Sequence, residues 1–193
     1  MELRTLMTRA VDTSVAVVQG IGPAMLDRPT PCPEYDVRAL LGHLAGWMTE
    51  RARGAATKRT AEGAPDESRD VTAEPGWADR FAGEVRATAA AWSEPAAWEG
   101  ESSLSGAMMM PAGMLGGLVF SEFLLHGWDL AAATDQKFAL DDDLAQALFE
   151  QVSSMADMAR KYGAFGAAVA VPASAPLTDR ALGLAGRDPA WTP

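Results

Sequence analysis

The sequence predicts an all-α protein, a bundle of four long helices with one shorter neighbour. Apolar residues recur at spacings of three and four over several long stretches, which is the periodicity of amphipathic helices. Glycines and prolines separate these stretches, and no alternating segment is long enough to predict a sheet. The 193 residues, 48% hydrophobic and 22% charged, fit one globular domain over 1–193.

This periodicity predicts the bounds of the five helices. They are expected over 2–19, from Asp36 to about 54, and over 77–92, 112–134 and 141–161. Asp36 is a favourable N-cap, and the acidic run Asp141 to Asp143 favours the positive N-terminal end of the fifth helix rather than a calcium site. The helix over 112–134 is apolar nearly all round, so we expect it to be central.

The connecting segments differ from the helices in composition. Three prolines within 29–33 exclude a helix there. Residues 55–75 are polar and contain two prolines, which predicts a mobile loop that could act as a lid. Residues 162–193 form a tail expected to pack on the bundle, with a short additional C-terminal helix over 178–184.

Charge and composition exclude several classes of function. Acidic residues exceed basic ones by 26 to 16, so the net charge of −10 argues against nucleic-acid and anionic-membrane partners. Cys32 is the only cysteine, which excludes an intrachain disulfide and fits a reducing, cytoplasmic location. The N-terminus has no apolar signal region, and the longest apolar stretch, 112–120, is too short to span a membrane.

The two histidines of the chain point to a metal site. Glu122 and His126 are four residues apart, so they face the same way on the most apolar helix. A buried carboxylate must be compensated, and a divalent cation is one means of doing so. His43, at the edge of the apolar stripe of its helix, would complete a three-ligand site with an open fourth position, which is typical of catalytic zinc. Asp129 could orient His126, or bind a helix N-terminus or an arginine.

Two alternatives to a metal remain open. Glu122 could pair with Arg38 or Arg51, or form a hydrogen-bonded structural pair with His43 in the protein interior. Several other residues are expected to have packing roles rather than chemical ones. These residues are Cys32, Trp47, Trp128 and the methionines Met108, Met109, Met110 and Met114, which could instead line an adaptable pocket.

Three segments resemble signatures of one protein family. Residues 29–44 (PTPCPEYDVRALLGHL) resemble the first signature of the mycothiol-dependent maleylpyruvate isomerase-like proteins of the DinB-like superfamily. Residues 121–131 (SEFLLHGWDLA) resemble the second, and 163–191 are similar to the closing segment of a shorter actinobacterial branch. An excess of arginine over lysine, 13 to 3, also fits an actinobacterial source.

The resemblance implies a DinB-like four-helix bundle that binds a divalent metal, usually zinc, through His43, Glu122 and His126. The isomerases carry an additional C-terminal domain, whereas only residues 162–193 follow the last long helix here. We therefore expect a metal-dependent thiol transferase, in which mycothiol attacks a small electrophile. No catalytic residue beyond the metal ligands is identified, and the thiol-binding residues are unassigned. The alternatives are a non-catalytic metal- or ligand-binding bundle and a maleylpyruvate isomerase-type cis–trans isomerase. The chain could also form a homodimer.

Overall fold

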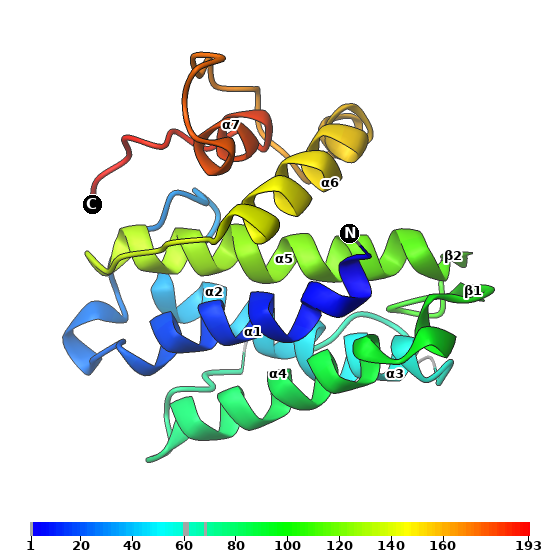
Figure 1. The fold of residues 1–193 in the computed structure, drawn as a ribbon. Coiled ribbons are helices and arrows are strands. Elements are labelled where there is room, and N and C mark those ends of the chain that lie inside the picture. The colour runs from blue at the N-terminus through cyan, green and yellow to red at the C-terminus, as the bar shows by residue number, and fades with distance from the viewer. Residues whose placement is uncertain (1, 60–61, 68) are drawn as a thin grey trace.

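The computed structural model describes residues 2–59, 62–67 and 69–193, and its regular secondary structure is almost entirely helical (Figure 1). The long helices are α1 (Leu3–Gln19), α4 (Trp77–Ser93), α5 (Ala112–Ala133) and α6 (Asp142–Lys161). The shorter elements are η1 (Pro23–Met25), α2 (Val37–Gly46), η2 (Trp47–Arg51), α3 (Ala52–Ala56), η3 (Pro95–Trp98) and α7 (Leu177–Leu184). Strands β1 (Glu101–Ser102) and β2 (Met110–Pro111) form a small antiparallel pair. The predicted all-α class is confirmed.

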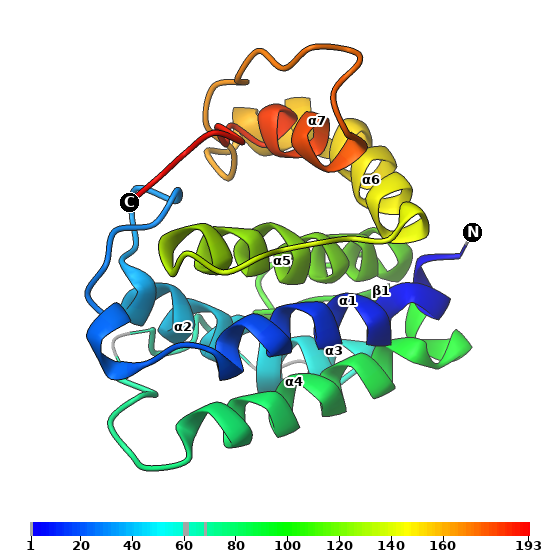
Figure 2. The same cartoon turned by 60° about the vertical axis from the view of Figure 1, so that its left-hand side comes forward.

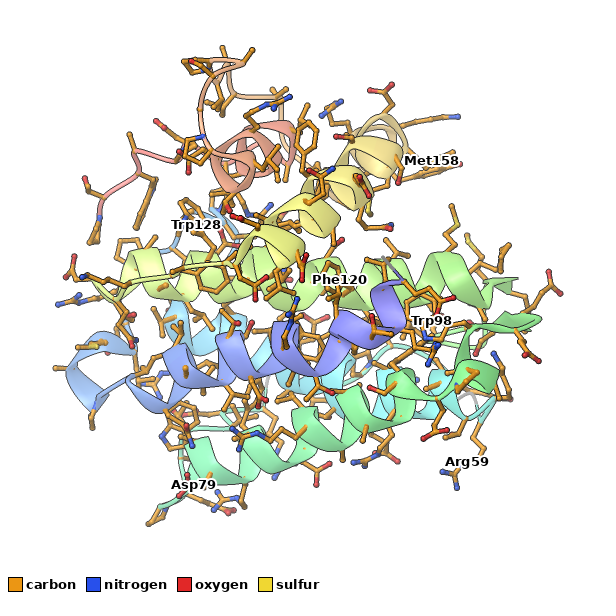
Figure 3. The ribbon with its side chains drawn as sticks, viewed as in Figure 1. Arg59, Asp79, Trp98, Phe120, Trp128 and Met158 are labelled. Atoms are coloured by element: carbon orange, nitrogen blue, oxygen red, sulfur yellow. The ribbon has the colours of Figure 1, made fainter. Side chains whose placement is uncertain are left out.

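Helix α5 lies in the middle of the molecule, as its composition predicts. It packs against α1, which in turn packs against α4, and α2 contacts α5 alongside them. Helices α6 and α7 lie on the other side of α5 from α1 and α4 (Figure 2). Phe120 of α5 is fully buried near the centre, whereas Asp79 and Arg59 lie at the periphery (Figure 3). Among the residues described, no helix combines the length and apolarity needed to cross a membrane.

Side-chain caps fix two of the helix starts. The Asp36 carboxylate accepts a hydrogen bond from the backbone N–H of Ala39, at 2.8 Å, and begins α2. The Asp141 carboxylate accepts one from the N–H of Leu144, at 2.9 Å, and begins α6. Each bond satisfies an N–H that has no partner within the helix, so both caps are confirmed.

The second predicted helix is divided into three helical pieces and extends further than expected. After α2 the backbone passes through a π-helical stretch, η2, and continues as α3 to Ala56. Ala55 and Ala56 are buried in the hydrophobic core, which explains why the helix does not end at 54. The prediction that the loop begins at residue 55 was therefore wrong by two residues.

Three of the four methionines before and within the start of α5 do not have the predicted packing role. Met108, Met109 and Met114 are 66%, 54% and 51% exposed, and they do not line the cavity described below. Met110 alone of the four packs against the core.

Candidate metal centre

His43, Glu122 and His126 converge from two helices. His43 lies on α2, and the other two lie one turn apart on α5. The Oε2 atom of Glu122 is 3.2 Å from Nε2 of His126 and 3.6 Å from Nε2 of His43. The two imidazole rings meet edge to face with their centroids 5.4 Å apart. The four-residue spacing on α5 and the packing of α2 against α5 therefore bring together the three residues that the sequence predicts.

The donor set fits a divalent ion. One potential ligand atom from each residue lies within 4.8 Å of the other two. Ligand atoms placed about 2.1 Å from a tetrahedral zinc ion are separated from one another by about 3.4 Å. The two measured separations from the Glu122 oxygen, 3.2 and 3.6 Å, lie on either side of that value. Two imidazoles and one carboxylate are also the ligands of several catalytic zinc sites.

The Nδ1 atom of His126, on the side of the ring away from Glu122, contacts a buried carboxylate. Its Nδ1 lies 2.9 Å from Oδ2 of Asp129, one turn further along α5. Arg187, from the C-terminal tail, donates two hydrogen bonds to Asp129, from Nε at 2.9 Å and from Nη2 at 2.8 Å. The Arg187 Nη1 donates to the carbonyl of Ala185. Because a carboxylate only accepts hydrogen bonds, the His126 proton on this side resides on Nδ1 and Nε2 is left facing Glu122.

His43 is held in the same way from a different part of the chain. Its Nδ1 lies 2.9 Å from Oε2 of Glu67, a residue of the segment between α3 and α4. The indole N–H of Trp47 donates to the other Glu67 oxygen at 2.7 Å, and the Tyr35 hydroxyl donates to Oε2 at 3.4 Å. His43 therefore also presents Nε2 toward Glu122. The two imidazoles thus have matching orientations about one carboxylate.

The electrostatics of the cluster keep its charges paired. Burial opposes ionisation of Glu122, but His126 and then His43 hold the pKa of this carboxyl well below its usual range. Burial also disfavours the imidazolium form of His126, but Glu122 and Asp129 raise its pKa to about 9. Burial of Asp129 is likewise outweighed by Arg187, which lowers the pKa of that carboxyl. Positive charge between the two histidines is therefore favoured, either as protons or as a metal cation.

The cluster forms part of the wall of a cavity of about 560 Å³. The connector before α2, the helices α2 and α5, and two stretches of the tail contribute to the wall. Its apolar side chains include Trp47, Met48, Leu118, Val119 and Phe165. A small molecule in the cavity would therefore contact apolar side chains over much of its surface. On one side it would face the Nε2 atoms of the two histidines.

The structure also tests the alternatives for Glu122 and Asp129. Arg38 pairs with Asp27 and Asp70 rather than with Glu122, and Arg51 donates to the backbone carbonyls of Glu62 and Gly63. Of the three roles considered for Asp129, two occur together, because it contacts both His126 and an arginine.

The expectations for the aromatic residues and the cysteine are met only in part. Trp47 and Trp128 both pack against the core, as expected, but Trp47 also lines the cavity and hydrogen-bonds Glu67, a role that the sequence did not predict. Cys32 is half-buried in the cavity wall, and burial together with the Asp129 charge raises the pKa of its thiol to about 11. That thiol remains protonated at neutral pH.

Sequence reasoning missed Glu67, Arg187 and Tyr35. Glu67 lies in a polar segment with no periodicity, and Arg187 is 58 residues from its partner Asp129. Arg187 and Tyr35 each lie in a segment that resembles a family signature, which was the one sequence feature that could have pointed to them. Neither signature specifies which residue they contact.

Comparisons with known proteins agree with the motif resemblance. The family model described as the mycothiol maleylpyruvate isomerase N-terminal domain matches residues 7–131, which include all three residues of the cluster. Two similar proteins of Mycobacterium tuberculosis are named "Uncharacterized protein MT0763", from strain CDC 1551, and "Uncharacterized protein Rv0738", from strain H37Rv. Each is 32% identical over 142 residues, which cover 71% of this chain and 70% of the relative. No solved structure shows a significant match. The chain belongs to the family of the mycothiol maleylpyruvate isomerase N-terminal domain.

Proposed function

We propose that the protein binds a divalent metal ion, zinc in the first instance, through His43, Glu122 and His126 and catalyses transfer of a small thiol to an electrophile. The thiol is mycothiol, in keeping with the family to which the chain belongs. The observation that carries the proposal is the pair of imidazole Nε2 atoms directed at one carboxylate beside a cavity of about 560 Å³.

A zinc ion with a vacant position supplies one kind of chemistry here, since it lowers the pKa of a coordinating thiol and keeps it as the nucleophilic thiolate. The residues of the chain supply the rest. Asp129 and Glu67 hold the two histidines in the orientation that leaves Nε2 free for the metal. The apolar cavity wall would hold the electrophilic carbon near the sulfur and exclude water, so that the reactants meet as a bound pair. As the carbon–sulfur bond forms, the carbon–oxygen bond of an epoxide opens, the π bond of an activated alkene breaks or the leaving group of an alkylating agent departs. An alkoxide or carbanion formed in this way takes a proton from solvent.

The charges of the cavity favour an uncharged electrophile. Arg187 is the only lysine or arginine among the described residues lining the cavity, and its guanidinium is bound to Asp129 and to the carbonyl of Ala185. Glu34 and Glu122 add negative charge to the same wall. The charge of a bound zinc ion would be offset by Glu122 and by the coordinated thiolate. A dicarboxylate of the maleylpyruvate type would then find no further cationic group available there, which favours transfer to an epoxide, activated alkene or alkylating agent over the isomerase reaction.

The first experiment measures metal content and thiol conjugation together. The purified protein is expected to hold about one zinc equivalent. Glu122→Gln and His126→Ala are expected to lose it, whereas Glu94→Gln, at an exposed position between α4 and η3, retains it. The metal-loaded protein should accelerate conjugation of mycothiol to monochlorobimane relative to the metal-free protein.

A matched pair of electrophiles tests the charge argument in the same assay. Iodoacetamide and iodoacetate differ by one negative charge, and the conjugate formed is quantified by mass spectrometry. The acceleration by the metal-loaded protein should be greater for the amide. Zinc retained by both Glu122→Gln and His126→Ala would overturn the metal assignment, and equal rates with and without metal would overturn the transferase assignment.

A further inference from the structure

We propose that Glu67 is a positioning residue of the metal centre, which holds His43 in its metal-binding tautomer, and that docking of residues 65–67 on α2 and metal binding strengthen each other. The inference rests on the proposed metal site and assigns a role to a residue outside the predicted ligand set. Its basis is the position of the Glu67 carboxylate between His43 and Trp47.

Both oxygens of Glu67 are engaged by N–H donors. Oε1 accepts from the indole N–H of Trp47 at 2.7 Å, and Oε2 accepts from Nδ1 of His43 at 2.9 Å. The Tyr35 hydroxyl donates a third, longer bond to Oε2. The indole can only donate, so the carboxylate is the group that satisfies both neighbours while keeping the His43 proton on Nδ1.

Two glycines of α2 allow the Glu67 segment to approach the helix closely. A Cβ atom at Gly42 would lie 3.0 Å from the backbone oxygen of Glu67, and one at Gly46 would lie 3.1 Å from Cβ and Cγ of Pro65. Gly42 and Gly46 are four residues apart and so lie on the same side of α2. They bring the backbone of the segment against the helix directly beside His43, which gives Glu67 its short reach to the imidazole.

Metal binding and docking of this segment are coupled through His43. Coordination at Nε2 makes the Nδ1–H of the same ring a better donor, which strengthens its bond to Glu67. By linkage, a segment held in place by that bond raises the affinity of the site for the metal by the same factor. The segment over 62–67 should therefore exchange its backbone amide hydrogens more slowly when zinc is bound.

Replacing Glu67 with glutamine separates positioning from packing. The amide has a single acceptor oxygen. If the oxygen faces His43, the NH₂ group opposes the Trp47 N–H; if it faces Trp47, the NH₂ group forces the His43 proton onto Nε2, where the metal would bind. Glu67→Gln should therefore weaken zinc binding about tenfold to a hundredfold, measured by competition with a chromophoric chelator. Glu62→Gln is the control, an exposed glutamate of the same segment.

Removing the competing donor should restore the affinity. In Trp47→Phe/Glu67→Gln the amide oxygen is free to accept from His43 without an opposing indole N–H. We expect its zinc affinity to return to within a few-fold of that of Trp47→Phe alone. Equal affinities of Glu67→Gln and the unmodified protein would overturn the proposal. An equal loss of zinc affinity in Glu67→Gln and in Trp47→Phe/Glu67→Gln would also overturn the proposal, because the loss would then reflect the missing charge of Glu67.

A measurement on the metal-free protein tests the assigned tautomer of His43 independently of the proposed function. The imidazole ¹⁵N chemical shifts of His43 are recorded at a pH at which the ring is neutral. In the unmodified protein they should show the proton mainly on Nδ1, and in Glu67→Gln they should show a smaller fraction of the Nδ1–H tautomer. An unchanged tautomer overturns the role of Glu67 even if zinc binds. Failure of the unmodified protein to bind zinc, with the tautomer shift present, overturns the proposed function and the coupling to metal but retains the positioning of His43 by Glu67.

Discussion

The two histidines of the cluster are supported by carboxylates of contrasting kinds. Asp129 lies on the same helix as His126, is completely buried, and is bound by Arg187 through two hydrogen bonds. Glu67 reaches His43 from an irregular segment, and 34% of its side chain is exposed. One support is thus part of the protein interior, and the other is assembled at the surface. We therefore expect substitution of Asp129 to lower mainly the stability of the fold and substitution of Glu67 to lower mainly the affinity for the metal.

The largest effect is expected from Asp129→Ala. It leaves the Arg187 guanidinium buried without its anionic partner, so the free energy of unfolding should fall by about 3–5 kcal/mol. Chemical denaturation checks this value. The matched control is Asp157→Ala, which removes an exposed aspartate–arginine pair on α6 and should cost less than about 1 kcal/mol. Comparable losses in the two variants would show that Asp129 does not support the interior.

A double substitution tests whether the loss of stability in Asp129→Ala comes from a direct interaction with Arg187. Arg187→Met alone leaves Asp129 buried with His126 as its one remaining charged partner among those described above, so it should also be destabilising. The loss in Asp129→Ala/Arg187→Met should be smaller than the sum of the two single losses, with a coupling of about 1–3 kcal/mol. Denaturation of all four proteins gives the coupling, and strict additivity would contradict a direct pair.

The smallest effect on stability is expected at the exposed support. Glu67→Ala should change the free energy of unfolding by less than about 1 kcal/mol, because water can reach the partners it leaves. Its zinc affinity should nevertheless fall at least about tenfold. The same denaturation and chelator-competition measurements apply. A loss of stability as large as that of Asp129→Ala would remove the distinction between the two supports.

Local periodicity explains how much of this arrangement could be predicted from the sequence. Glu122 and His126 were placed together because helix geometry fixes residues four apart, and the caps at Asp36 and Asp141 follow from local hydrogen bonding. His43, the other histidine of the chain, was the expected third ligand, and the motif resemblance implied the same three residues. These features depend on neighbours in the sequence or on a recurring pattern.

The supports of the histidines could not be predicted in this way. Glu67 contacts His43 because a segment without periodicity docks on two glycines of α2, and Arg187 reaches Asp129 only after α6 and α7 bring the tail back to α5. Both contacts depend on the packing of distant segments, which hydrophobic spacing does not encode. The alternatives for Asp129 remained open at the sequence level for the same reason.

The position of Arg187 bears on where a functional fragment of this protein could end. The match to the family model ends at residue 131, whereas the guanidinium that neutralises Asp129 comes from the last few residues of the chain. A fragment cut at the boundary of the match would contain every proposed ligand and still expose the carboxylate behind His126 to solvent without its counter-charge. In this chain, the segment that the family model matches is shorter than the segment needed to hold the site together.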